Sequence, residues 1–185
     1  MSQRETEVKL PIPDLAQAQQ LLRDVATRVH QERHFEDNLV FDTAELKLRN
    51  EGLLLRLRTI GAQTILTFKG ALRISDGVRD REEIECSIAP PESMLRVLQQ
   101  LGYSVTFRYQ KYRTIHEIEG YRLHICLDET PIGNYFELEG EIGHIHGCAE
   151  RLGYSRADYI TESYGALYFR WCSENRIQPS HMTFP

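Results

Sequence analysis

The stretch LLLRLRTIGAQTILTFKG, residues 53–70, is typical of two β-strands joined by a tight turn. A Gly-Ala pair separates two runs in which apolar and polar side chains alternate, and a period of two places the two kinds on opposite faces of a strand. Arg56, Arg58 and Lys69 lie opposite leucine and phenylalanine side chains. This segment therefore predicts a hairpin with one apolar face and one basic face.

The same alternation of charged and apolar residues continues along the rest of the chain. Further strands are predicted at residues 4–10, 34–43, 78–88, 104–118, 121–129 and 135–142. The charges that align on their polar faces are Glu5, Glu7, Lys9, Arg81, Glu83, Glu85, Lys111, Arg113, Asp128, Glu137 and Glu139. One such strand alone would turn its charges to water. Their repetition on so many strands instead favours a shared charged interior.

Predicted helices supply a cover for the apolar strand faces. The patterns indicate helices at residues 14–29, 91–101, 148–153 and 157–171. Asp14 is a predicted N-cap of the first helix. Residues 73–77 and 144–147 are predicted as loops. If the helices pack outside the strands, the charged faces must line an interior, and the fold class is α+β.

Composition places the chain among globular proteins and limits its partners. Its 185 residues are 41% hydrophobic and 26% charged, which predicts one domain at residues 1–175 with a tail at 176–185. A formal charge of −5 argues against a nucleic-acid partner, which usually needs a basic excess. No apolar run approaches the roughly 20 residues of a membrane span, so we expect no membrane partner and a cytoplasmic location. The four cysteines are widely spaced and are expected to stay reduced.

A charged interior indicates that the protein binds a charged ligand there. Cations and carboxylates occur in nearly equal numbers on the predicted inner faces, but a buried charge cluster that pairs only with itself is rarely worth its desolvation. Arginine and lysine are suited to holding phosphoryl oxygens. Carboxylates provide the oxygen ligands that Mg²⁺ and Mn²⁺ prefer. The pattern therefore favours a polyanion bound together with a divalent metal.

Histidines at two places in the sequence could line the interior or bind metal, and we assign none of them to a metal site. His124 shares the predicted inward face with Asp128, and we interpret it as a structural histidine. His144, His146 and Cys148 superficially look like a soft-metal cluster. Tetrahedral metal sites need ligands that converge from separated segments, and the sequence offers no second half for this one.

These motifs, taken together and in this order, resemble those of the CYTH-domain proteins, the triphosphate tunnel metalloenzymes. Glu5-x-Glu7-x-Lys9 is similar to the family's ExExK signature. The segments that follow in the family's order are LRLR, TFKG, REEIE, KYR and LDETPIGNYFELEG. The resemblance extends from about residue 4 to residue 170, so it covers nearly the whole chain.

The resemblance implies a closed eight-stranded antiparallel β-barrel with helices outside, which binds a triphosphate with Mg²⁺ or Mn²⁺. The residues that it assigns to phosphate are Lys9, Arg56, Arg58, Lys69, Arg81, Lys111 and Arg113. The residues that it assigns to metal are Glu5, Glu7, Glu137 and Glu139, with Glu83, Glu85 and Asp128 as further ligands or their supports. The residues expected to be catalytic are Glu5, Glu7, Lys9, Arg56, Arg58 and Lys69. Homodimers are common among such barrels, and the sequence alone does not decide the oligomeric state.

The family includes inorganic triphosphatases, thiamine triphosphatases and class IV adenylyl cyclases. We therefore compare three functions for this chain: a hydrolase, a cyclase and a non-catalytic binding module. We favour metal-dependent hydrolysis of tripolyphosphate, thiamine triphosphate or a nucleoside triphosphate, because the sequence reveals no nucleobase pocket. The alternative is a class IV adenylyl cyclase that converts ATP to cyclic AMP and pyrophosphate. A third interpretation is a non-catalytic module that binds polyphosphate or a nucleotide.

Overall fold

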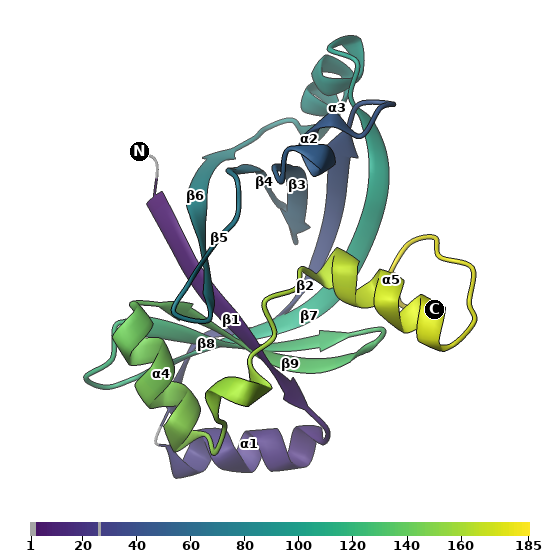
Figure 1. The fold of residues 1–185 in the computed structure, drawn as a ribbon. Coiled ribbons are helices and arrows are strands. Elements are labelled where there is room, and N and C mark those ends of the chain that lie inside the picture. Colours follow the sequence, from purple (N-terminus) through teal and green to yellow (C-terminus); the bar gives the residue numbers. More distant parts are fainter. Residues whose placement is uncertain (1–2, 26) are drawn as a thin grey trace.

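A computed structural model describes residues 3–25 and 27–185, and in these residues eight antiparallel strands close into a barrel (Figure 1). The strands are β1 (Gln3–Ile12), β2 (Thr27–Asp42), β3 (Leu54–Ile60), β4 (Gln63–Lys69), β6 (Val78–Ser87), β7 (Ser104–Ile118), β8 (Leu123–Thr130) and β9 (Gly133–Gly140). Their order is β1-β9-β8-β7-β2-β3-β4-β6, and β6 pairs with β1 to close the ring. A short additional strand, β5 (Arg73–Ser75), pairs with β6. The predicted fold class is confirmed.

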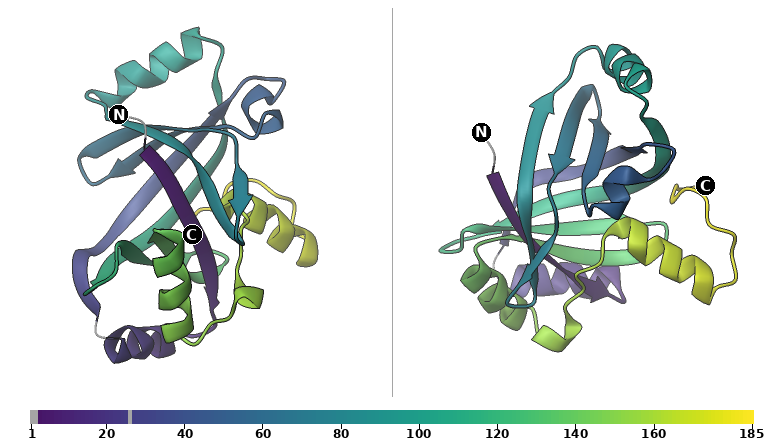
Figure 2. Two further views of the ribbon diagram at one scale, coloured as in Figure 1. Left: turned by 60° about the vertical axis from the view of Figure 1, so that its left-hand side comes forward. Right: turned by 45° about the horizontal axis from the view of Figure 1, so that its top comes forward.

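Five α-helices lie in the described residues, outside the barrel. They are α1 (Leu15–Asp24), α2 (Lys47–Asn50), α3 (Pro91–Gln100), α4 (Ile142–Arg151) and α5 (Tyr164–Glu174). A 3₁₀ turn, η1 (Arg156–Asp158), precedes α5. Helices α1 and α4 lie near one end of the molecule and α3 lies at the other, as Figures 1 and 2 show. None of these helices is long and apolar enough to cross a membrane.

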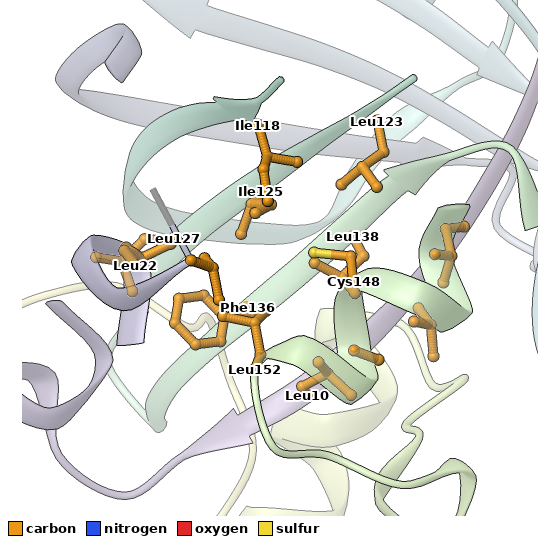
Figure 3. Packing of buried hydrophobic residues seen from close by; sticks show 14 of the residues in the cluster. Leu10, Leu22, Ile118, Leu123, Ile125, Leu127, Phe136, Leu138, Cys148 and Leu152 are labelled. Carbon is orange, nitrogen blue, oxygen red and sulfur yellow. The ribbon is translucent and has the colours of Figure 1, made fainter. Parts of the chain in front are cut away.

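The largest hydrophobic core lies outside the barrel wall, between strands β1, β8 and β9 and helices α1 and α4. Ile125, Phe136 and Leu138 point outward from the strands and are fully buried. Leu22 of α1 and Leu152, the C-cap residue of α4, pack on them from the helical side (Figure 3). Burial of such side chains stabilises the fold by about 1.5–3 kcal/mol each. The apolar faces of these strands are therefore turned away from the tunnel.

Two smaller cores cover other parts of the wall. Leu98 of α3 packs with Phe41 of β2 and Leu57 of β3. Helix α5 packs through Tyr168 on Phe107 of β7, and this cluster also includes Met182 and Cys172. Both cores place apolar contacts on the outside or at the end of the barrel, which leaves its interior to polar side chains.

Strand register brings the charged residues of three neighbouring strands together. Glu5 faces Arg81 and Glu7 faces Arg79 across the β1–β6 pair. On the other side of β1, Lys9 faces Glu137 of β9. The closing strand pair thus joins charges that are far apart in the sequence.

Two predicted helices are shorter in the structure. The helix predicted at residues 14–29 ends at Asp24, because the backbone from Thr27 onward pairs with β7. The helix predicted at residues 157–171 begins only at Tyr164. The backbone of Ile160 bonds to Lys9 in both directions, and the Ser163 side chain caps α5. Tertiary pairing overrides local helix propensity in both places.

Two predicted loops contain regular structure. Residues 73–77 form β5 and a turn, since Arg73–Ser75 pairs with β6. Residues 144–147 belong to α4. Ile145, Cys148 and Ala149 follow at helical spacing and are fully buried against β1 and β9, so this segment gains more from packing than its glycines and histidines suggest.

We expect Gly140→Ala to lower the free energy of unfolding by about 1–3 kcal/mol, measured by urea denaturation. A Cβ atom there would approach the Leu123 Cβ to 2.6 Å and the Arg122 carbonyl more closely still. Gly143→Ala is the matched control, because its Cβ would meet nothing within 4 Å and lies in α4. Equal stability of the two variants would contradict this account.

Candidate active site

The barrel interior contains alternating basic and acidic side chains. The basic residues are Lys9, Arg56, Arg58, Lys69, Arg79, Arg81, Lys111 and Arg113. The acidic residues are Glu5, Glu7, Glu36, Glu83, Glu85, Asp128, Glu137 and Glu139. The structure brings together all residues that the sequence assigned to phosphate or metal, most of them around a cavity of about 580 Å³. Asp128 lies behind this lining and Glu85 is exposed at its edge.

Three carboxylates form a compact acidic cluster. Glu5, Glu7 and Glu139 each offer an oxygen, and these oxygens all lie within 4.8 Å of one another. Burial raises the pKa of Glu139 to about 8, with Arg113 opposing the shift and the charges of Glu137 and Glu5 adding to it. A set of carboxylate oxygens drawn together in this way matches the donors that a hard divalent cation needs. The residues present therefore fit Mg²⁺ or Mn²⁺.

Glu7 remains ionised in spite of its burial. Burial alone would raise its pKa, but the charges of Lys9, Lys69 and Arg79 lower it to about 2. The Lys9 ammonium lies 3.5 Å from Glu7 and 2.6 Å from Glu137. Glu7 is thus available as a charged ligand at neutral pH.

Asp128 organises the basic side chains on the far wall. Its carboxylate accepts from the Lys111 ammonium at 2.9 Å, from the Arg113 guanidinium at 2.7 Å and from the Tyr164 hydroxyl at 2.6 Å. Asp128 is fully buried. Because three donors already occupy its oxygens, the geometry favours a role in positioning Lys111 and Arg113 over direct metal ligation.

In the part of the chain that the structure describes, three arginines each carry a buried Nε donor that makes no hydrogen bond. The Nε groups of Arg56, Arg79 and Arg81 are buried and have no hydrogen-bond acceptor among the described residues. Leaving a buried donor unsatisfied costs about 1–3 kcal/mol, and more for a charged group. Such groups normally indicate a missing partner. An anion with several oxygens is a partner of the kind that these donors lack.

Arg56 and Tyr109 form a further polar pair. An Arg56 Nη donates to the Tyr109 hydroxyl at 3.1 Å, and the other Nη donates to Thr67 Oγ1 at 3.2 Å. Burial opposes ionisation of Tyr109, but Arg56, Arg58 and Lys111 lower its pKa to about 8. The sequence pattern places Tyr109 on the same strand face as Lys111 and Arg113. A tyrosine alone gave no reason to assign it a role in phosphate or metal binding.

Sequence reasoning gave no role to two charged residues of the interior, Glu36 and Arg79. Glu36 is buried with its carboxylate 3.3 Å from Arg58 and 3.6 Å from Lys111. Arg79 lies 3.3 Å from Glu7. Arg79 lies on the same face of the strand as Arg81, so the alternating sequence pattern was sufficient to place it in the interior. The signal of Glu36 was weaker, because the polar residue Asp37 follows it on the opposite face.

The two ends of the tunnel differ in chemistry. The end near the start of β7 and α5 is lined by apolar and aromatic side chains, among them Leu46, Phe107 and Phe169. The end near the close of β7 opens into a charged cavity of about 1140 Å³, bordered by Glu117, His124 and several other ionisable groups. Glu5, Glu83 and Glu139 border both cavities, so the two spaces adjoin.

Comparison with known families gives a match over most of the chain. Residues 3–164 match the CYTH domain family. No curated protein matches the sequence.

Several solved structures share the fold. A Vibrio parahaemolyticus protein provisionally named an adenylate cyclase has a TM-score of 0.74 and 22% identity, covering 89% of this chain and 97% of that one. A Pyrococcus horikoshii protein has a TM-score of 0.73 and 21% identity, covering 90% and 98%. A Hippeastrum protein, provisionally named an adenylyl cyclase and described as having a dominant triphosphatase activity, has a TM-score of 0.64 and 24% identity, covering 95% and 98%. At these identities the likeness shows the fold.

We expect Glu36→Gln to destabilise the protein at pH 7 by about 3–5 kcal/mol, since it removes the buried carboxylate that faces Arg58 and leaves Lys111 with Asp128 as its remaining acidic partner. Burial would raise the pKa of Glu36, but Arg58 and Lys111 hold it well below its ordinary value. A carboxylate whose pKa is lower in the folded state than in the unfolded state stabilises the fold at pH values above its unfolded-state pKa. This stabilisation is lost as the pH falls through its folded-state pKa.

The variant should therefore lose less stability than the parent protein between pH 6 and the acid limit of folding. Urea denaturation at a series of pH values measures this difference. Glu32→Gln, an exposed position on the same strand, is the matched control and should follow the parent curve. Parallel curves for the parent protein and Glu36→Gln would refute the assignment.

Proposed function

The chain belongs to the CYTH domain family, and we propose that it hydrolyses a triphosphate with the help of a divalent metal. The observation that carries the proposal is the group of buried arginine donors at Arg56, Arg79 and Arg81 that have no acceptor among the described residues. Together with the surrounding lysines they form a phosphate-binding surface on the inside of a closed wall. The solved relatives with cyclase and triphosphatase descriptions support the same enzyme class.

Phosphate binding would draw on two kinds of basic group. The Nε groups of Arg56, Arg79 and Arg81, which make no hydrogen bond to the described residues, can donate to phosphate oxygens. Lys69 and Lys9 are now paired with Glu5 and Glu137, and those pairs would loosen when substrate and metal bind. Charge-assisted hydrogen bonds from arginine to phosphate are stronger and more directional than neutral ones.

Glu5, Glu7 and Glu139 would hold the metal, which when bound supplies charge neutralisation and lowers the pKa of a coordinated water. The protein's own contribution is to fix the phosphates. Asp128 and Tyr164 hold Lys111 and Arg113 in place before substrate arrives. Pre-arranged donors of this kind stabilise charge that develops during phosphoryl transfer without a reorganisation cost.

The apolar end of the tunnel supports a substrate with an organic group. Phe107, Phe169 and Leu46 offer a surface for such a group beside the phosphate-binding interior. Asp42 accepts from the backbone of Leu48 at 2.9 Å and Ser163 caps α5, while the Arg49 guanidinium lies over the Phe169 ring, 5.4 Å from its centroid. A surface that is apolar but offers few free hydrogen-bonding groups favours a permissive triphosphatase.

An adenylyl cyclase is the second candidate. The same aromatic surface is suited to packing against an adenine ring, because flat aromatic groups stack favourably. In that reaction the ribose 3′-hydroxyl would attack the α-phosphate and pyrophosphate would leave. The two reactions differ in the position of the α-phosphate, which is set by how deeply the organic group enters.

One assay separates the candidates. Purified protein is incubated with Mg²⁺ or Mn²⁺ and with tripolyphosphate, thiamine triphosphate or ATP. Release of orthophosphate supports hydrolysis, and cyclic AMP with pyrophosphate supports the cyclase. Binding without turnover of any of the three substrates would refute both in favour of a non-catalytic module.

We expect Arg81→Met to lower kcat/KM by about 10- to 100-fold, since a hydrogen bond to a charged group is worth about 1.5–3 kcal/mol. Burial and the neighbouring charge of Arg79 lower the pKa of Arg81, so its charge disfavours the ligand-free fold. The variant should therefore be at least as stable as the parent in urea denaturation. Arg73→Met, on exposed β5, is the control. If Arg81→Met lowered both the free energy of unfolding and kcat/KM, the result would indicate a purely structural role for Arg81.

We expect Glu7→Gln to raise the metal concentration needed for half-maximal activity by about tenfold or more, because it removes one charged ligand of the acidic cluster. Titration of activity with Mg²⁺ or Mn²⁺ at saturating substrate measures this. Glu82→Gln lies on the exposed outer face of β6 and should leave the metal dependence unchanged. An unaltered titration for Glu7→Gln would remove Glu7 from the proposed metal site.

A further inference from the structure

A second group of metal-ligand side chains lies at the charged end of the tunnel, outside the carboxylate cluster. His30, Glu117 and His124 come from the adjacent strands β2, β7 and β8. We propose that they form a binding site for a first-row transition metal, with Zn²⁺ as the representative ion. His124, which the sequence suggested was structural, is half-exposed at this end.

The three side chains already converge on one point. The His30 Nδ1 lies 2.9 Å and the His124 Nε2 lies 3.5 Å from the same oxygen of Glu117. All three potential ligand atoms lie within 4.8 Å of one another. Tetrahedral Zn²⁺, with bonds of about 2.0–2.1 Å, separates its ligand atoms by roughly 3.3 Å. Small side-chain rotations would therefore suffice to coordinate an ion.

Strand geometry holds this arrangement. Glu117 faces Arg28 on one neighbouring strand and His124 on the other. The β2–β7 register shifts between Val29 and Gln31, so His30 lies at the irregularity. Bulges of this kind re-aim a side chain and are common next to functional sites.

Arg28 acts on Glu117 from behind the site. Its Nη2 donates to the second Glu117 oxygen at 2.8 Å, which leaves the first oxygen facing the two histidines. Partners of this type orient a ligating carboxylate and are a regular part of metal sites. The pair thus directs a single oxygen toward the metal position.

The donor set distinguishes this site from the carboxylate cluster. Two imidazoles and one carboxylate suit Zn²⁺, Cu²⁺ or Ni²⁺, whereas an all-oxygen set suits Mg²⁺ or Mn²⁺. The His30 and His124 side chains are 50% and 45% exposed, so an ion can enter from solvent and water can complete its coordination. His124 also faces Glu139 across the β8–β9 pair, which places the two donor sets side by side.

Zinc titration of the full-length protein in excess Mg²⁺ tests the proposal, because Mg²⁺ occupies the oxygen sites. Calorimetry should show one Zn²⁺ bound per chain. His30→Ala and His124→Ala should each weaken its affinity at least tenfold. Glu7→Gln, which alters the carboxylate cluster, and His144→Ala, on α4, should leave it unchanged. Unchanged Zn²⁺ affinity in both histidine variants would overturn the proposal, as would loss of binding in Glu7→Gln.

Cobalt substitution gives an independent measurement. Co²⁺ bound to the parent protein in excess Mg²⁺ should show the visible d–d absorption of a low-coordinate nitrogen site, and the double variant His30→Ala/His124→Ala should lack it. Zn²⁺ should also raise the melting temperature of the parent but not of the double variant, because a ligand that binds only the folded state stabilises it. A Co²⁺ spectrum that is the same in both proteins would locate the ion elsewhere and refute the site.

Discussion

Pairing of buried charges is the constraint on which the rest of this structure depends. Arg113 illustrates it, because its buried guanidinium contacts Asp128, Glu137 and Glu139 at once. Removing one member of such a buried set would leave its partners uncompensated, at a cost of several kcal/mol. The acids therefore have two tasks. Some hold the basic side chains in position, and others remain close together as a cluster that a cation can neutralise.

This interior requires the hydrophobic core to lie elsewhere. The strands turn Ile125, Phe136 and Leu138 outward, and helices α1 and α4 bury them. Stability is thus supplied mainly by the outer layer, while the inner layer is organised for binding. The separation explains how a small domain tolerates unsatisfied arginine donors in its interior: the cost is borne by packing on the opposite face of the same strands.

The alternating pattern of the sequence was sufficient to predict the strands, the hairpin at residues 61–62 and the inward direction of most charges, because a period of two leaves few alternatives once one face is apolar. Long-range pairing was not predictable. Ile160 belongs to a helical pattern but bonds to Lys9, and Thr27 continues a helical pattern but begins β2. The convergence of His30 with His124 was equally hidden, since it depends on a strand irregularity and on the order of strands in the barrel.

The unlike ends of the tunnel give a bound molecule a direction. An apolar group can find contacts at Phe107 and Phe169, whereas the described residues that line the end bordered by Glu117 and His124 are mostly charged or polar. A substrate with one apolar and one highly charged end would therefore thread in a single orientation, with its phosphates leading. Under the proposed hydrolysis, the two fragments would then lie toward opposite ends of the tunnel, and neither would have to pass the other.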